Sequence, residues 1–256
     1  MSVWDRLGAY DEPPEVSALR ERSKEVLEGL ANVAVERPTA VQPLLGVEAL
    51  VLQLRRIAPA ASRSSWVLQP RYSYDPEDPG VALTRAARER GVETELVTLP
   101  TTVEAHPLLS SIFPATLLGP VFLRGLVVDG RHAIVGGPAD AVGRRVAWYT
   151  TMPAVVDDVI DLWRATVPLC RPILAPGETP PLTERQLEVA RLMCVGVKDH
   201  VIARTLLLSP RTVEREVARI LSVLEAGSRT EAVLLMRGRG VNGGRRGDNA
   251  PSEVTS

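Results

Sequence analysis

The segment 170–181 divides this chain, because four prolines and one glycine occur within its twelve residues. Proline has no backbone N–H and a fixed φ, so such a segment can neither continue a helix nor pair as a central strand. The 256 residues are 45% hydrophobic, which is enough apolar material for about two domains. We therefore expect one domain over residues 1–169, a proline-rich linker over 170–181, and a second domain over 182–240.

The composition excludes several classes of protein. Two cysteines in a chain of this length cannot form the framework of a disulfide-rich secreted fold. No apolar run reaches the roughly 18 residues that a membrane span needs, and the N-terminus lacks the basic and apolar segments of a signal peptide. We expect a cytoplasmic protein that does not bind membranes, with a disordered tail over the polar, glycine-rich residues 241–256.

Charge is distributed unevenly along the chain, although the net charge is only −1. Residues 1–180 contain 18 basic and 22 acidic side chains, whereas residues 181–240 contain 10 basic and 7 acidic ones. The second domain is therefore the basic one, which is compatible with a nucleic-acid partner.

The first domain mixes the spacing of helices with that of strands, which predicts an α/β fold with a mixed sheet and flanking helices. An Asp-Gly pair between two apolar runs predicts a tight hairpin, because both residues accept a positive φ. The apolar stripe of the second helix, Val47 included, should face the core. The expected helices cover residues 16–33, 47–57, 81–90, 105–113 and 153–167, and the expected strands cover 65–69, 93–99, 121–128, 132–136 and 145–151.

Helix start and stop signals are clear in the second domain. Thr183 followed by Gln186 predicts a capping box, and the helix that it starts should stop near Gly196. Two further helices are expected over residues 199–206 and 210–224. The second of them begins with a serine cap followed by Pro210 after a three-residue turn, so the pair forms a helix-turn-helix.

A helical wheel of the helix over 210–224 separates an apolar stripe from a polar face. The stripe consists of Val213, Val217, Ile220, Leu221 and Leu224. The opposite face holds Arg211, Arg215, Ala218 and Ser222, flanked by Glu214 and Arg219. Arginines and small residues suit a helix that enters a DNA major groove about 12 Å wide. A solvated helix face is the alternative interpretation of the same pattern.

The same domain carries a longer pattern: Leu182-Thr-Glu-Arg-Gln-Leu-Glu-Val189, Gly196, Ile202-Ala203, Leu206, Ser209-x-x-Thr212-Val213, Ile220-Leu221, Leu224 and Ser228-Arg-Thr-Glu-Ala232. This pattern resembles the LuxR/FixJ-type (GerE-like) helix-turn-helix of bacterial transcription regulators. The resemblance implies a small all-α domain of four helices. Its third helix would read DNA, and its fourth, over residues 229–237, would pair two copies on a two-fold site.

The resemblance also implies a set of candidate DNA-binding residues. Side chains that would face the groove are Arg211, Glu214, Arg215, Ala218 and Arg219, and Ser222 completes this face. Those expected near phosphates are Lys198, Arg204 and Thr212.

Two acidic residues depart from the family pattern, which commonly has lysine at the position of Glu214 and histidine at that of Glu216. A carboxylate facing a polyanion weakens binding unless it accepts a hydrogen bond from a cytosine amino group. The alternative is a degenerate regulator that acts through protein contacts without binding DNA.

The first domain lacks the residues of two common signal-receiving modules. Its only lysine before residue 181 is Lys24, which excludes a phosphorylated receiver domain, and no Gly-Lys-Ser/Thr sequence exists for a P-loop. The order of elements in this domain resembles that of phospholipase-D-like and TrmB-type sensor domains. The segments that carry the resemblance are Trp66-Val-Leu-Gln-Pro70, Arg85-Ala-Ala-Arg-Glu-Arg-Gly-Val-Glu-Thr-Glu-Leu-Val97 and Arg124-Gly-Leu-Val-Val-Asp-Gly-Arg-His-Ala-Ile-Val135.

Catalysis in the phospholipase-D-like superfamily uses a His-x-Lys pair, and neither His106 nor His132 has that lysine. We expect a noncatalytic domain; a divergent phosphodiesterase-like enzyme is the alternative. The carboxylates of Asp157, Asp158 and Asp161 are interpreted as solvated, the segment 72–76 as a turn, and neither metal nor cofactor is expected. Together these features predict a dimeric regulator that binds double-stranded promoter DNA and responds to an unknown small-molecule or protein signal.

Overall fold

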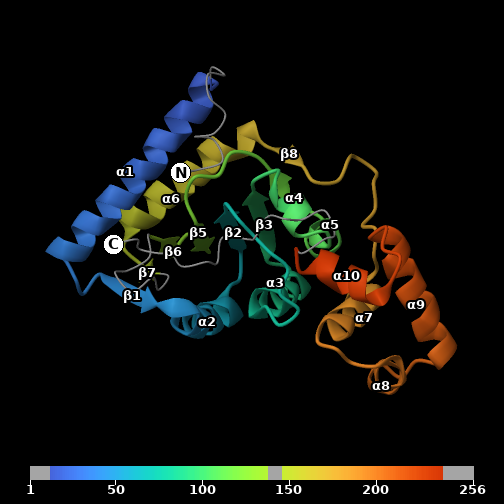
Figure 1. Ribbon diagram of the computed structural model, residues 1–256. Helices are drawn as coiled ribbons and strands as arrows, with labels where there is room; N and C mark the ends of the chain where they lie inside the picture. Colours follow the sequence, from blue (N-terminus) through green and yellow to red (C-terminus); the bar gives the residue numbers. More distant parts are fainter. Residues whose placement is uncertain (1–11, 138–145, 239–256) are drawn as a thin grey trace, which may run out of the picture.

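The computed structural model describes residues 12–137 and 146–238. The tail expected over 241–256 lies outside the described residues, as does Arg145, the first residue of one expected strand. The N-terminal part folds around one mixed sheet and the C-terminal part is helical, which confirms the expected fold class (Figure 1).

One mixed sheet organises the N-terminal part. Its strands are β1 (Val41–Leu45), β2 (Ser64–Gln69), β3 (Glu93–Thr98), β4 (Leu117–Leu118), β5 (Gly125–Val128), β6 (His132–Gly136), β7 (Val146–Thr150) and β8 (Arg171–Pro172). Among the described residues they form an eight-stranded sheet in the order β1-β7-β6-β5-β2-β3-β4-β8. The pairs β2–β3 and β3–β4 are parallel, and the other neighbours are antiparallel.

Helices cover both faces of this sheet, giving three layers (Figure 1). One face packs against α1 (Pro14–Glu36) and α6 (Pro153–Thr166), where the rings of Trp66 and Trp163 stack with centroids 5.8 Å apart. The other face packs against α2 (Gly46–Ile57) and α3 (Pro79–Glu89). Two single 3₁₀ turns, η2 (Ala58–Ala60) and η3 (Val167–Leu169), follow α2 and α6.

The predicted hairpin is present between β5 and β6, with Asp129 at φ 54° and Gly130 at φ 64°. The Asp129 carboxylate accepts backbone N–H groups of Ser62, Arg63 and Ser64 at 2.8–2.9 Å. Partial burial alone would raise the pKa of Asp129, but these hydrogen bonds outweigh it and hold the pKa below its ordinary value. The turn is therefore tied to the start of β2.

Three short strands were missing from the sequence prediction. β1 contains Pro43 and β8 contains Pro172, and proline within a strand argues against a central strand. Both strands lie at sheet edges, where proline is tolerated because the strand has a hydrogen-bonding neighbour on one side only. β4 has only two residues, too few for a periodic pattern. Through β8, the start of the expected linker joins the sheet.

Other differences from the prediction concern boundaries and burial. The expected helix over 105–113 is two single turns, α4 (Thr102–Ala105) and α5 (Leu109–Ile112), because Pro107 interrupts it. The strand expected from residue 121 begins at Gly125. Val47 is 61% exposed, so the prediction that it faces the core is wrong: it lies in the first turn of α2, beside the edge strand.

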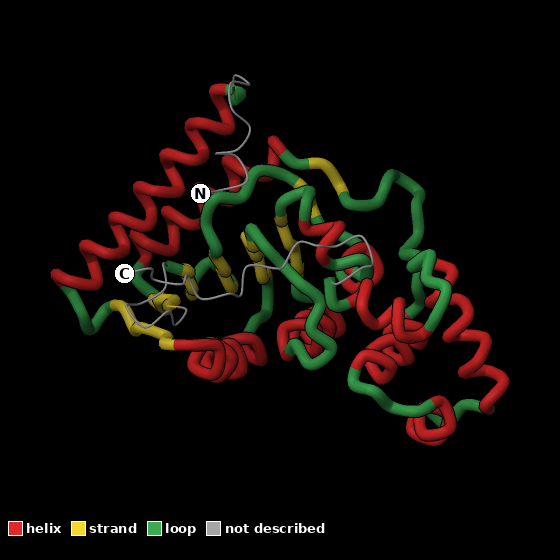
Figure 2. Tube along the Cα trace, in the orientation of Figure 1, coloured by secondary structure: helices red, strands yellow, loops and turns green. Residues whose placement is uncertain are grey.

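The C-terminal part consists of α7 (Glu184–Cys194), α8 (Asp199–Thr205), α9 (Pro210–Val223) and α10 (Arg229–Met236). Figure 2 shows that this part is built of helices and loops, with the strands gathered on the other side of the molecule. Its apolar core includes Tyr74 and Leu108 from the N-terminal part, and α5 lies against α7. None of the helices within the described ranges combines the length and apolar character needed to cross a membrane.

Candidate nucleic-acid interface

The helix-turn-helix geometry starts with the cap of α7. The Thr183 side chain accepts a hydrogen bond from the Gln186 N–H at 3.4 Å, and the Gln186 side chain accepts one from the Thr183 N–H at 2.8 Å. This confirms the predicted capping box. Gly196 follows the helix at φ 81°, which ends it where expected.

The turn between α8 and α9 sets the angle of the candidate reading helix. Leu207 has φ 54° and is almost fully exposed, and the Leu208 N–H donates to the Ala203 carbonyl at 2.8 Å. Ser209 then caps α9 by accepting the Thr212 N–H at 3.1 Å. The predicted turn and cap are confirmed: a backbone bond in the turn and the Ser209 hydroxyl hold the N-terminal end of α9.

The inner face of α9 holds the helix in the core. Val213 and Ile220 are 0% exposed, Leu224 is buried, and Val217 and Leu221 are partly buried. All five residues of the predicted apolar stripe therefore face the core of the helical region.

The outer face of α9 carries the candidate base-contacting side chains. Exposed residues here are Arg211, Glu214, Arg215, Ala218, Arg219 and Ser222. Arg219 donates to the Pro181 carbonyl at 3.4 Å, which links this face to the end of the 170–181 segment. The structure thus places three arginines, two small residues and one carboxylate of the predicted set on one exposed surface.

The candidate phosphate-contacting residues lie at helix ends. Lys198 is the exposed N-cap residue of α8, and Arg204 is exposed in the last turn of the same helix. Thr212 is partly buried, and its hydroxyl lies 2.8 Å from that of Ser209. No ion pair among the described residues involves Lys198 or Arg204, so neither positive charge is neutralised there.

Glu216, the second acidic departure from the family pattern, is buried in the structure. It is only 6% exposed, and its carboxylate accepts a hydrogen bond from the Gln186 amide at 2.9 Å and lies 3.4 Å from the Arg215 guanidinium. Glu216 therefore does not belong to the exposed face of α9, unlike Glu214. The helical wheel already contained the signal, because residue 216 lies about 60° from Val213.

Arg229 and Arg237, at the two ends of α10, have structural partners. Arg229 pairs with Asp199 and donates to the Val197 carbonyl at 2.6 Å, and Arg237 donates to the Cys194 carbonyl at 2.9 Å. These bonds brace α10 against the loops around α7 and α8. The guanidinium groups of Arg229 and Arg237 therefore have a structural role, and they are not counted among the candidate DNA contacts.

The polar candidates of the N-terminal part have ordinary structural contacts. His132 Nδ1 lies 2.8 Å from the Tyr149 hydroxyl, and Asp161 pairs with Arg22 and Arg164. Within the ranges that the structure describes, no three His, Cys, Asp or Glu side chains are grouped as metal ligands would be.

Comparison with known proteins assigns the helical region. Residues 180–236 match the family "Bacterial regulatory proteins, luxR family". This confirms the LuxR-type (GerE) helix-turn-helix predicted from the sequence. A comparison of the whole chain with curated proteins finds no match.

Three solved structures resemble parts of the chain. TrmBL2, an archaeal chromatin protein with a novel mode of DNA binding, is 16% identical over 60% of this chain and 63% of its own, with a TM-score of 0.39. Nuc, a phospholipase D family member from Salmonella typhimurium, is 18% identical over 53% of this chain and 98% of its own, with a TM-score of 0.42. VqmA of Vibrio cholerae, in a complex with ligand and DNA, is 26% identical over 46% of this chain and 50% of its own, with a TM-score of 0.24.

Proposed function

We propose that this protein is a cytoplasmic transcription regulator that binds promoter DNA as a dimer through α9 and is controlled by its N-terminal part. The observation that carries the proposal is the outer face of α9, which presents Arg211, Arg215 and Arg219 on the third helix of a LuxR-type domain. Ala218 and Ser222 on the same face permit close approach to base edges.

Each candidate residue has a role in this proposal. The three arginines of α9 pair with guanine or phosphate, which a planar guanidinium can bind with two hydrogen bonds. Lys198, Arg204 and Thr212 contact the phosphate backbone and fix the register of α9 in the groove. The fourth helix, α10, pairs two copies so that two reading helices meet a two-fold site.

The N-terminal part is proposed as a noncatalytic sensor over residues 1–169, connected to the DNA-binding domain over 182–240 by the segment 170–181. The missing lysine partners of His106 and His132 support this assignment over a phosphodiesterase. A signal that binds the sensor would favour one arrangement of the two DNA-binding domains over another, which requires different contacts in the two arrangements.

We expect Arg215→Ala to weaken binding to promoter DNA by about 1 to 3 kcal/mol and to relax sequence preference, because a base-contacting guanidinium is lost. The measurement is fluorescence anisotropy of the full chain on its own upstream DNA and on a scrambled duplex, between about 50 and 200 mM salt. Arg56→Ala, which removes an exposed arginine from α2, is the matched control. Equal affinities for the Arg215→Ala and Arg56→Ala variants would remove Arg215 from the reading surface.

A specific observation favours one second candidate function, a regulator that acts through protein contacts. Glu214 is exposed on the outer face of α9, where it would repel phosphates. We expect Glu214→Lys to tighten DNA binding. The slope of log K for DNA against log salt concentration should steepen by the amount of about one additional phosphate contact. The control is Glu89→Lys on α3, which changes net charge equally. DNA binding that appears only in the Glu214→Lys variant would favour the protein-contact function for the natural chain.

A further inference from the structure

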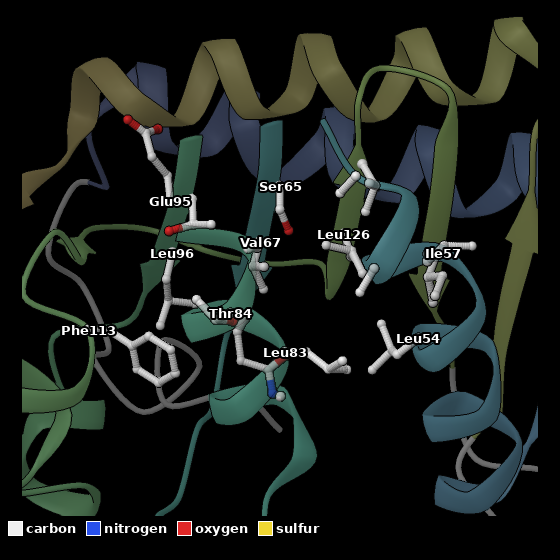
Figure 3. A pocket seen from close by; sticks show the side chains of 18 of the residues that line it. Leu54, Ile57, Ser65, Val67, Leu83, Thr84, Glu95, Leu96, Phe113 and Leu126 are labelled. Atoms are coloured by element: carbon white, nitrogen blue, oxygen red, sulfur yellow. The ribbon is translucent and has the colours of Figure 1, made fainter. Parts of the chain in front are cut away.

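A cavity of about 220 Å³ lies between the sheet and the helices α2 and α3. Its lining is mainly aliphatic: Figure 3 shows Val67, Leu96 and Leu126 from the sheet facing Leu54 and Leu83 from the two helices. Val67 is only partly buried, although β2 is a central strand. Protein interiors are normally packed without gaps of this size, and well-formed apolar cavities are common binding sites for small molecules.

The size of the cavity limits its occupant. An apolar protein cavity of about 150 Å³ holds benzene, whereas drug-sized ligands occupy about 300–1,000 Å³. A volume of about 220 Å³ therefore suits a single ring or a short branched chain.

Two arginines line this cavity, Arg124 beside the start of β5 and Arg88 on α3. The Arg88 Nε donates to the Thr94 hydroxyl at 2.7 Å and its Nη1 donates to the Ile112 carbonyl at 3.3 Å. Within the described part of the chain, no ion pair involves Arg88. Partial burial lowers the pKa of Arg88, and the guanidinium lies over the ring of Phe113, 5.7 Å from its centroid.

The lining contains two acidic residues, Asp78 and Glu95, and neither has a carboxylate oxygen within 4.0 Å of the Arg88 guanidinium nitrogens. Asp78 caps α3 by accepting the Gly80 N–H at 2.7 Å, and it also accepts the Tyr72 hydroxyl at 2.6 Å. Glu95 points away from the cavity toward α6 in Figure 3. An anionic group on the occupant would form an ion pair with Arg88.

We propose that this cavity binds a small carboxylic acid with a compact apolar body, whose carboxylate pairs with the Arg88 guanidinium. The apolar body would fill the space between Val67, Leu83 and Leu54, where its burial is favourable. A carboxylate and a guanidinium form charge-assisted hydrogen bonds, which are the stronger kind.

The cavity is connected to the helical region through α5. On one side, Arg88 donates to the carbonyl of Ile112, and Phe113 lines the cavity. On the other side, Ser111 accepts the Leu182 N–H at 3.1 Å, and Leu108 lies in the core of the helical region. An acid that draws Arg88 from Ile112 would therefore act on the contact between α5 and α7; its effect on DNA binding rests on the function proposed above.

Isothermal titration calorimetry of the full chain with phenylacetate, benzoate and 4-methylpentanoate tests the site. We expect at least one acid to bind one site per chain with a Kd of about 1 mM or tighter, and its uncharged amide to bind at least about tenfold more weakly. The absence of binding by all three acids up to about 10 mM would overturn the ligand class. Equal affinity for acid and amide would overturn the role of Arg88 without depending on any variant.

Two variants locate the site. Val67→Phe should fill the cavity and weaken acid binding at least about tenfold, whereas Val35→Phe, at a residue 82% exposed on α1, should leave it unchanged. Arg88→Met should weaken the acid but not the amide. Circular dichroism confirms that each variant is folded. Unchanged acid binding by folded Val67→Phe would overturn the location.

Anisotropy on upstream DNA with and without the tightest acid tests the connection. We expect the Kd for DNA to change at least about threefold at saturating acid. An unchanged Kd would overturn the connection through α5. The absence of DNA binding under both conditions would contradict the proposed function, whereas the calorimetry still decides whether the cavity binds acids.

Discussion

Replacing Leu108 with alanine is expected to lower the free energy of unfolding by about 2 to 5 kcal/mol and to loosen the helical region from the sheet. Leu108 is 0% exposed, and although it belongs to the N-terminal part, it lies in the apolar cluster of Leu182 and Leu187. Its truncation leaves a cavity at the junction of the two parts. The contact between α5 and α7 should weaken with it.

The neighbouring residue provides a matched control. Leu109 is also 0% exposed, but it packs with Leu96 and Phe113 on the sheet side of α5. Leu109→Ala should therefore cost a similar free energy and leave α7 protected. Urea unfolding gives the free energies, and hydrogen exchange by mass spectrometry gives the protection of α7. Equal loss of protection in the two variants would mean that Leu108 does not specifically hold the junction.

This junction also marks the limit of what the sequence can predict. The proline-rich segment 170–181 predicted two parts joined by a linker. Capping residues and periodicity within α7, α8 and α9 made these helices predictable, because the signals are local. The packing of Leu108 on α7 joins residues more than 70 positions apart, and no local pattern encodes such a contact.

The candidate sites differ in the same way. The outer face of α9 could be predicted because all of its residues belong to one helix and the wheel gives their directions. The burial of Glu216 depends on the amide of Gln186, which lies on another helix and donates a hydrogen bond to its carboxylate. The cavity beside Arg88 could not be predicted, because its walls come from α2, α3 and four strands. Tyr72, interpreted as part of a turn, contributes to its lining.

Acidification is expected to destabilise the protein through His106, which lies at the same junction. His106 is 1% exposed, its ring lies 5.3–5.4 Å from those of Tyr72 and Tyr74, and its Nδ1 has no hydrogen-bond partner among the described residues. Burial lowers the pKa of His106 from 6.5 to about 4. Between these two pKa values, His106 is protonated in the unfolded chain and neutral in the folded state.

The sign of the pH dependence follows from these two values. Above about pH 6.5 neither state binds the proton, so the full stability is present; between about pH 6.5 and 4 the unfolded state binds more protons, and stability falls as pH falls. From pH 7 to pH 5 the loss from this group is on the order of 2 kcal/mol. Urea unfolding at pH 7, 6 and 5 measures it.

Two variants separate His106 from the rest of the protein. His106→Phe removes the titrating group and keeps an aromatic ring, so most of this loss between pH 7 and pH 5 should disappear, whatever the variant's stability at pH 7. His132→Gln should keep the loss, because it leaves the buried ring of His106 in place. An undiminished loss in His106→Phe would place the acid-sensitive group elsewhere. If His132→Gln keeps the loss of stability and His106→Phe does not, the acid-sensitive group lies in the segment just before α5. This is where the sheet region contacts the helical region.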